Sequence, residues 1–463
     1  MTATVNPITV DVVVVGAGSA GVAAAAAAAE EGATTVLLEA SGHVGGTLAW
    51  QLLEHSAGFH DVHGNQVIAG FGDRLIGRLK ELGSSPGHIL DDVGYTATRT
   101  PVNHVELSLM EAVMLGEAGV QLWLNSPVVA VQREGDRITG LTVETPAGRR
   151  ELRPGQVVDA SGDAVVARRA GARFHEDAAR THQPASLTFK LGGVDFAALL
   201  DYARANPADF RPGNIIGDAA DSDVNLWGLG SLLARGYQDG QLSLQRSEMH
   251  LAGWPRRGEA VVNVSRVSAG DVEENWTGDA AIQLSRQVLE FVRWFRHAVP
   301  GCAECYVAAV ADRVGVRESG RVVGVATLTR DDLLHPVSRP DSIARGAFPI
   351  DIHEPDKPSL SHTEQLTEPY DIPYGCLVVD GIDNLLVAGR CISSTHEANG
   401  SARITATCFA TGEAAGVAAA LAASGNSAAP AVDVALLRQT LVRRGVLLST
   451  QVKRPIHFAP VDC

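Results

Sequence analysis

ITVDVVVVGAGSAGVAAAAAAAEEGATTVLLEA, residues 8–40, has the pattern of a strand, a glycine turn, a helix and a second strand. The run 11–15 is mostly valine, as expected of a parallel strand that is buried on both faces. The alanine run 23–29 favours a helix, and its small side chains let that helix lie close to a sheet. These residues predict a βαβ unit and therefore an α/β fold.

The turn of this unit has the glycine spacing of a dinucleotide-binding site. Gly16 makes the tight turn, Gly18 lets a pyrophosphate approach the backbone, and Gly21 permits close packing of the helix. The helix N-terminus offers free N–H groups to the phosphates. Glu39 follows about 20 residues on, where a carboxylate accepts hydrogen bonds from ribose hydroxyls. We expect the cofactor contacts on these residues and on their neighbours Ala17, Ser19, Ala20 and Ala40.

Both NAD and FAD bind to such a unit, and two further segments favour FAD. GHVGGT (42–47) is a second small-residue loop soon after Glu39, and VVDASGD (157–163) ends a later strand. A flavin reaches across more of the sheet than a nicotinamide does, so it needs contacts of this kind. Between them, residues 127–152 alternate in polarity and turn at EGDR and PAGR, which predicts a small β-meander.

With these motifs the sequence resembles the FAD-dependent oxidoreductases of the glutathione reductase-like and succinate dehydrogenase flavoprotein-like superfamily. Similarity is greatest to a bacterial group that also has VRESGR (316–321), YDIPY (370–374), NLLVAGRCISSTHEANGSAR (384–403) and GEAAG (412–416). The resemblance extends from about Val10 to Leu421. It implies a Rossmann-like FAD-binding domain with a parallel sheet and small β-meander, a mixed α+β substrate domain, and non-covalently bound FAD.

The resemblance also implies further FAD contacts. The adenine would lie near the backbone of Val129, and many related flavoproteins have an AGD motif at the late strand end where this chain has Arg390. A helix beginning near Ile404 would point its positive end at the flavin. The implied contacts are Gly45, Gly46, Thr47, Val129, Ser161, Gly162, Asp163, Gly389, Arg390, Ala402 and Ile404.

Polar residues near the expected flavin are the catalytic candidates. His396 is the candidate acid or base, because it is a titratable group in a segment expected to reach the ring; ordering of that segment against Glu397 is the alternative. Arg317 and Arg403 would orient the substrate or stabilise charge on the flavin, with solvated ion pairs as the alternative for Arg317. His60, after the GG motif, is the histidine of that segment to test.

The chain has a single GxGxxG, so no second unit for a bound nicotinamide is expected. We therefore expect dehydrogenation of a small polar or anionic organic substrate by hydride transfer to flavin N5, with oxygen or an electron carrier as acceptor. The alternative is a C=C reductase or a hydroxylase that uses external reducing equivalents. A non-catalytic flavoprotein with a binding role is a third hypothesis.

Composition limits the partners. The 463 residues carry a net charge of −15, which argues against nucleic acid and against an anionic membrane surface. No secretion signal is apparent, so we expect a cytoplasmic protein; a homo-oligomer is left open. Cysteine and histidine spacings predict no metal site, and we expect Cys391 to be a small buried residue.

After residue 175 the pattern changes to mixed strands and helices. The predicted boundaries are 8–174 for the first part of the FAD-binding domain, 175–370 for the substrate or cap domain, 371–425 for the second part of the FAD-binding domain, and 426–463 for a C-terminal helical tail.

Overall fold

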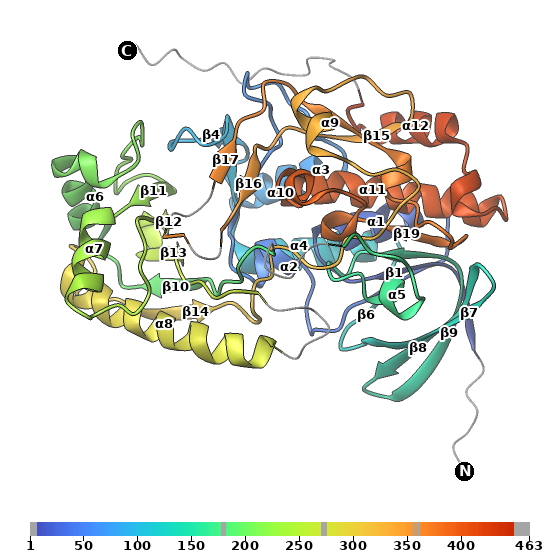
Figure 1. The fold of residues 1–463 in the computed structure, drawn as a ribbon, viewed down its shortest axis with the longest axis horizontal. Coiled ribbons are helices and arrows are strands. Elements are labelled where there is room, and N and C mark those ends of the chain that lie inside the picture. The colour runs from blue at the N-terminus through green and yellow to red at the C-terminus, as the bar shows by residue number, and fades with distance from the viewer. Residues whose placement is uncertain (1–6, 177–181, 270–275, 355–356, 359–361, 449–463) are drawn as a thin grey trace.

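The computed structural model describes residues 7–176, 182–269, 276–354, 357–358 and 362–448. The molecule has two parts that lie side by side (Figure 1). One contains a sheet made from both ends of the chain, and the other, drawn in green and yellow, contains a sheet from the middle of the chain. We call the second the cap sheet.

The larger sheet has the strand order β6-β2-β1-β9-β8-β7, and β19 pairs with β9 as well. β1 (Ile8–Val15) is central and parallel to both of its neighbours, β2 (Thr35–Leu38) and β9 (Gly148–Asp159). The parallel part is completed by β6 (Gln121–Trp123) and β19 (Leu385–Val387). The predicted βαβ unit and the Rossmann-like α/β class are therefore confirmed.

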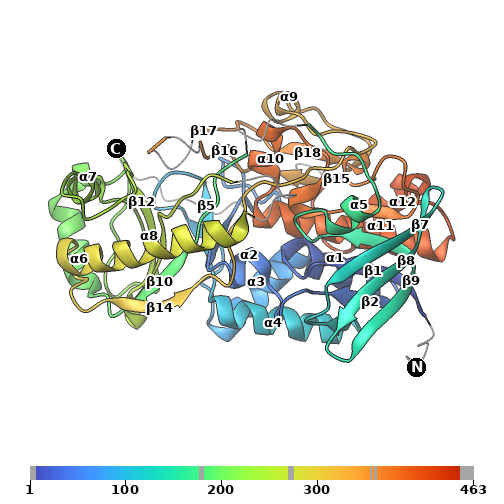
Figure 2. The same cartoon turned by 60° about the horizontal axis from the view of Figure 1, so that its bottom comes forward.

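The predicted meander belongs to the same sheet. Its strands β7 (Val128–Glu134) and β8 (Arg137–Thr145) pair antiparallel, and β8 pairs with the first half of β9. The second half of β9 lies between β1 and β19, so one long strand joins the meander to the parallel strands. The sheet has seven strands in all. Its strands β7, β8, β9, β1 and β2 form one twisted layer beside the helices in Figure 2.

Two helices pack very closely beside this sheet. α1 (Ser19–Glu30) and α11 (Thr405–Ser424) touch through Gly412 and Gly416, where an added Cβ would lie 2.1 Å from the carbonyl oxygens of Ala20 and Ala24. Among the described residues, α11 is the one helix long and apolar enough to cross a membrane, yet 89% of its apolar window is buried in the protein. This burial is typical of a core helix.

The cap sheet is antiparallel with the order β11-β12-β13-β10-β14. One face carries Leu226, Leu251 and Val262, which join a core formed with the helices of the cap. The other face carries polar residues, because side chains alternate along each strand. The bounds are β10 Phe189–Gly192, β11 Val224–Gly228, β12 Met249–Trp254, β13 Glu259–Asn263, β14 Tyr306–Val310, α6 Phe196–Ala205, α7 Gly230–Gln238 and α8 Thr277–Ala298.

Smaller elements complete the larger part of the molecule. The chain rejoins the larger core already at Val322, before the boundary predicted at residue 370. The helices are α2 Gly46–Ala49, α3 Phe71–Leu82, α4 His104–Glu117, α5 Val165–Arg169, α9 Arg330–Leu334, α10 His396–Ala402 and α12 Val434–Arg443. The strands are β3 His55–Ala57, β4 Ile89–Leu90, β5 Thr98–Pro101, β15 Ser342–Gly346, β16 Ile350–Ile352, β17 His362–Glu364 and β18 Tyr370–Pro373.

A buried polar network fastens the cap sheet to the larger part. Lys190 on β10 donates to the carboxylate of Glu54 at 2.7 Å, and Trp254 on β12 donates to the other oxygen at 2.8 Å. His104, at the start of α4, contacts the same carboxylate at 2.5 Å. Glu54 is 1% exposed, so these contacts fix the cap where water cannot replace them.

Candidate active site

A cavity of 330 Å³ lies between the glycine turn of α1, the first turn of α11 and the polar face of the cap sheet. Most of the predicted cofactor residues line it: Gly16, Gly18, Ser19, Ala20, Glu39, Gly46, Thr47, Ser161, Gly162, Asp163, Gly389, Arg390 and Ile404. So do Arg317 and Arg403. Segments that lie far apart in the sequence therefore meet around one cavity.

The turn at α1 has the shape that a pyrophosphate requires. Gly16 has φ +96°, and an added Cβ would lie 2.6 Å from the Cα of Ser161. A Cβ on Gly46 would lie 2.7 Å from the Cα of Gly18, so the two glycine loops touch. The hydroxyl of Ser19, in the first turn of α1, is buried without a hydrogen-bond partner in the described part of the chain. Open backbone, a helix N-terminus and an unused hydroxyl fit the phosphates of FAD.

Glu39 shapes this turn directly. One of its carboxylate oxygens accepts from the Ala17 N–H at 2.7 Å, and the other accepts from the Ser41 N–H at 2.8 Å. Glu39 lines the cavity, and Arg313 lies 3.9 Å from it. The carboxylate therefore holds the glycine loop in position at the cavity wall, where a ribose would meet it.

Arg390 is tied to the protein. Its Nε donates to the Gly162 carbonyl at 2.9 Å, and its Nη2 pairs with Asp163 at 2.6 Å. Its Nη1 also donates to the carbonyl of Val316. Arg390 thus connects two segments of the cavity wall, so part of its hydrogen-bonding capacity is used before a ligand binds.

His396 does not line the cavity. The segment expected to reach the flavin contains a short helix, α10, because the Thr395 side chain caps it by accepting from the Ala398 N–H. His396 is the first residue of that helix, and its Nδ1 contacts Glu318 at 2.9 Å. Burial disfavours its charged form, but the hydrogen bond to Glu318 and that carboxylate's charge leave the pKa of His396 raised. Glu318 also forms a buried ion pair with Arg321, so His396 contacts a carboxylate that already has a cationic partner.

His60 also lies outside the cavity wall. It is 5% exposed, its Nδ1 contacts the hydroxyl of Thr98 at 3.0 Å, and its ring packs on His88. Six predicted cofactor residues likewise do not line the cavity: Ala17, Gly21, Ala40, Gly45, Val129 and Ala402. Gly21 serves packing, because an added Cβ would lie 1.7 Å from the Gly16 carbonyl oxygen. Val129 is 41% exposed on β7.

One end of the cavity is basic. Arg317 donates to the Pro184 carbonyl at 2.7 Å and to the Ser186 hydroxyl at 2.8 Å, both through Nη1. Arg403 contacts Asp351 at 3.2 Å. Burial, then the charges of Arg403 and Arg266, lower the pKa of Arg317 to about 9, which still leaves it a cation at neutral pH. Two cations at the wall favour an anionic ligand.

His353 belongs to the same end. Its Nε2 lies 3.1 Å from Asp351, and both side chains line the cavity. Burial is the main cause that lowers the pKa of His353 to about 4, so its imidazole is neutral at pH 7. The arginines are therefore the cations of this wall.

Another part of the cavity wall is aromatic. Trp227 on β11 lies opposite His250 on β12, and their ring centroids are 4.8 Å apart. Tyr95 stacks on Trp227 at 5.4 Å, His55 meets His250 edge-on at 4.7 Å, and Phe348 packs against Tyr95. All five rings line the cavity. They form a largely apolar chamber beside the basic end.

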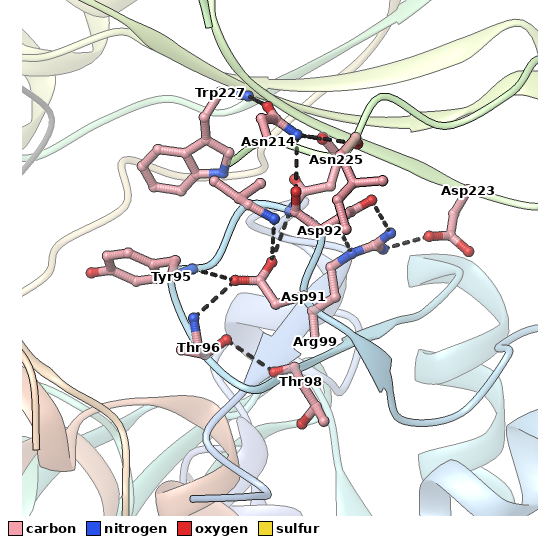
Figure 3. Close-up of polar contacts among 12 residues, drawn as sticks. Asp91, Asp92, Tyr95, Thr96, Thr98, Arg99, Asn214, Asp223, Asn225 and Trp227 are labelled. Carbon is pink, nitrogen blue, oxygen red and sulfur yellow. Dashed lines mark hydrogen bonds and ion pairs between the residues drawn. The ribbon is translucent and has the colours of Figure 1, made fainter. Parts of the chain in front are cut away.

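Tyr95 owes its place to an irregular loop that is pinned to the cap sheet (Figure 3). Asp91 accepts from the Tyr95 N–H at 2.7 Å and from the Thr96 N–H at 2.8 Å. Arg99 donates two hydrogen bonds to the carboxylate of Asp92, one from Nε and one from Nη2, and it also forms an ion pair with Asp223 of the cap. The loop therefore crosses from one part of the molecule to the other and delivers its aromatic ring to the chamber.

Sequence reasoning missed most of the chamber. His55 was passed over in favour of His60, five residues on, and His250, Trp227, Tyr95, Asp351 and His353 were not singled out. A signal existed for the cap residues: in MHLAGW (249–254), His250 alternates with apolar residues that face the core, which marks it as lying on the other face.

Cys408 lines the cavity, whereas Cys391, the cysteine considered in the sequence analysis, does not. Cys391 is fully buried, and burial raises the pKa of its thiol. In the described ranges, no group of three or more histidine, cysteine, aspartate or glutamate residues is placed to hold a metal ion.

Comparison with known proteins defines the class. A family model for FAD-dependent oxidoreductases matches residues 11–441, so the chain belongs to this family. It is an oxidoreductase enzyme whose cofactor is FAD. A search of curated proteins found no match.

Solved structures with a similar fold include a geranylgeranyl bacteriochlorophyll reductase-like protein from Thermoplasma acidophilum, with 16% identity, a TM-score of 0.49, and coverage of 95% of this chain and 85% of that one. A p-nitrophenol 4-monooxygenase from Pseudomonas putida DLL-E4 has 11% identity, a TM-score of 0.48 and coverage of 94% and 85%. A flavin-dependent brominase has 13% identity, a TM-score of 0.45 and coverage of 94% and 83%.

Proposed function

We propose that this FAD-dependent oxidoreductase dehydrogenates a small organic acid, removing a hydride and a proton from a C–H/O–H or C–H/N–H pair. The observation that supports this most directly is the cavity, which is lined both by the glycine turn of α1 and by Arg317 and Arg403. A cofactor on the turn and a small anion at the arginines would share one cavity.

Arg317 and Arg403 each have N–H groups that make no hydrogen bond within the described residues. Arg317 uses only Nη1 for protein contacts among the described residues, which leaves Nε and Nη2 for a ligand. The Nε of Arg403 is buried and has no hydrogen-bond partner within the described ranges. A substrate carboxylate would accept from these groups, and charge-assisted hydrogen bonds of this kind fix both position and orientation. FAD, when bound, supplies a two-electron acceptor for the substrate's hydride.

The chamber next to the arginines would hold the rest of the substrate. Its rings are neutral or apolar, so they exclude water from the carbon that loses hydride. The first turn of α11, with Thr405 at the cavity, directs a positive helix end into the same space. Reoxidation by oxygen or an electron carrier, and a cytoplasmic location, are parts of the proposal.

An anaerobic assay tests the proposal. The purified protein is mixed with small 2-hydroxy and 2-amino acids, with their amides as neutral matched compounds, with amines, and with NADPH. We expect one or more of the acids to bleach the flavin absorbance and the corresponding amides to fail. Bleaching by NADPH while every acid fails would instead support the C=C reductase or hydroxylase alternative.

A further inference from the structure

Two histidines from different parts of the molecule meet in the chamber. His55 is on β3, beside the glycine loops, and His250 is on β12 of the cap sheet. Their rings are 4.7 Å apart at 71°, and both line the cavity. The hydrogen bonds of each ring determine which nitrogen carries hydrogen, and therefore which nitrogen is free to accept a proton.

The tautomer of His55 is fixed by a backbone carbonyl. Its Nδ1 lies 2.6 Å from the carbonyl oxygen of Leu53. Because a carbonyl only accepts, Nδ1 must carry the hydrogen. In the neutral ring Nε2 then has an unused lone pair. His55 is therefore a hydrogen-bond acceptor at the cavity.

The tautomer of His250 is fixed by a chain of three residues. Its Nε2 lies 2.6 Å from the side-chain oxygen of Asn225, and the amide nitrogen of Asn225 donates to Asp91 at 3.3 Å. A carboxylate only accepts, so the amide orientation of Asn225 is set, and its oxygen must accept from His250. Figure 3 shows Asp91 and Asn225 in this arrangement, with Asp91 also held by the loop amides. The lone pair of His250 is consequently on Nδ1.

Both rings are neutral at pH 7. Burial is the main cause that lowers the pKa of His55 to about 4 and the pKa of His250 well below its ordinary value. Of the charged groups that act on the pair, the cations oppose protonation and the carboxylates favour it; they are Arg99, Arg211, Asp91 and Glu54. An anionic substrate in the chamber would add negative charge and raise both pKa values. The capacity to take up a proton would therefore increase when substrate binds.

We propose that His55 and His250 form the proton-accepting pair of this enzyme, an inference that rests on the function proposed above. The proton of the substrate's O–H or N–H group moves to the free nitrogen of one imidazole, and the O–H or N–H electrons become the second bond of a C=O or C=N group. The neighbouring C–H bond breaks with its two electrons, which pass as hydride to FAD. Asn225 and Asp91 are positioning residues, since they act through His250.

Nuclear magnetic resonance of protein labelled with ¹⁵N-histidine tests the tautomers without any turnover. The signals are assigned with His55→Gln and His250→Gln. We expect His55 to carry hydrogen on Nδ1 and His250 on Nε2 at pH 7, each with one unprotonated nitrogen. In Asn225→Leu, the His250 signals should shift toward a mixture of tautomers while those of His55 stay in place. A cationic ring at pH 7, or the opposite tautomer at either residue, would overturn the proposal.

Anaerobic flavin reduction by an acid that bleaches the wild-type protein is the second test. His55→Gln and His250→Gln should each bind FAD and the acid normally, while at least one slows reduction by about 100-fold or more, as for loss of a general base. His60→Gln is the matched control, a buried histidine outside the cavity, and should stay within a few-fold of wild type. Full rates in both His55 and His250 variants would overturn the pair but leave the proposed function intact. If no acid bleaches the wild-type flavin, the proposed function itself fails.

Discussion

Arg317 has opposite effects on folding and on substrate binding. The guanidinium lies on the cavity wall, and in the described part of the chain only neutral oxygens accept from it. Taking a cation out of water without an anionic partner costs free energy. A bound carboxylate would supply the missing anionic partner, so much of this cost would be offset when substrate binds. Arg317 is only partly buried and the charge of Asp351 partly offsets this cost, but we still expect the ligand-free fold to be less stable than it would be with an apolar residue there.

Replacing Arg317 separates these two effects. We expect Arg317→Met to raise the melting temperature of the FAD-loaded protein without substrate, and to raise the dissociation constant of the acid about 10- to 100-fold, from loss of about 1.5–3 kcal/mol of charge-assisted hydrogen bonding. Thermal unfolding and titration of the flavin spectrum measure the two quantities. Arg78→Met, at a surface ion pair with Glu117, is the control and should leave the acid's affinity unchanged. Unchanged affinity in Arg317→Met would remove this residue from the substrate site.

Site residues that belong to a local sequence motif were predicted from the sequence. Site residues that come together only in the folded protein were missed. Gly16 and Gly18 were predicted because a tight turn and close backbone approach require glycine at fixed spacings, and Gly46 was predicted from the family resemblance. His55 and His250 are 195 residues apart in number and lie in ordinary strands. The alternation in 249–254 places His250 on the face away from the cap core, but it does not distinguish a proton acceptor from a structural histidine. Their role depends on the carbonyl and amide that orient each ring.

At the scale of elements, the contact of α1 with α11 positions the glycine turn. Gly412 admits the backbone of α1 to van der Waals distance, and the N-termini of both helices border the cavity. We expect Gly412→Ala to destabilise the fold and lower FAD occupancy together, because the new Cβ would lie 2.1 Å from the Ala20 carbonyl and must push α1 away. Chemical unfolding and the ratio of flavin to protein absorbance measure these effects.

Gly77→Ala is the matched control for that helix variant. Gly77 lies on the exposed face of α3, and an added Cβ would meet nothing within 4 Å. Alanine there should stabilise the protein by about 0.5–1 kcal/mol through helix propensity alone, with FAD occupancy unchanged. Equal occupancy in Gly412→Ala and wild type would contradict the coupling between the helix contact and the cofactor turn.

The same two helices indicate how far elements could be predicted. The start of α11 near Ile404 was predicted correctly, because a polar Gly- and Ser-rich stretch gives way there to a long apolar run. The short helix α10 was not, since His-Glu-Ala-Asn-Gly-Ser-Ala has weak helix propensity and depends on the Thr395 cap and on burial for its conformation. Because α10 forms, His396 contacts Glu318 and does not line the cavity as predicted.

At the scale of the whole molecule, the buried Lys190–Glu54 pair joins the cap sheet to the larger part. Burial by itself would raise the pKa of Glu54, but the hydrogen bond from His104 and the charge of Lys190 lower it below its ordinary value. A carboxylate with a lowered pKa in the folded state stabilises the fold above its unfolded value of about 4.3. That contribution is lost as the pH falls through the folded pKa, so the docking of the cap should weaken in acid.

Lys190→Met tests this docking, because it leaves the Glu54 carboxylate buried without its strongest cationic partner. We expect it to lower the free energy of unfolding by about 3–5 kcal/mol at pH 7, measured by urea denaturation. The double variant Lys190→Met/Glu54→Gln should regain most of this loss, because no charge is then buried at the junction. The difference between Lys190→Met and wild type should shrink near pH 4, where Glu54 takes up a proton in the variant and, at still lower pH, in the wild type. A difference that stays constant from pH 7 to pH 4, or a double variant no more stable than Lys190→Met, would show that the pair does not hold the cap through its charge.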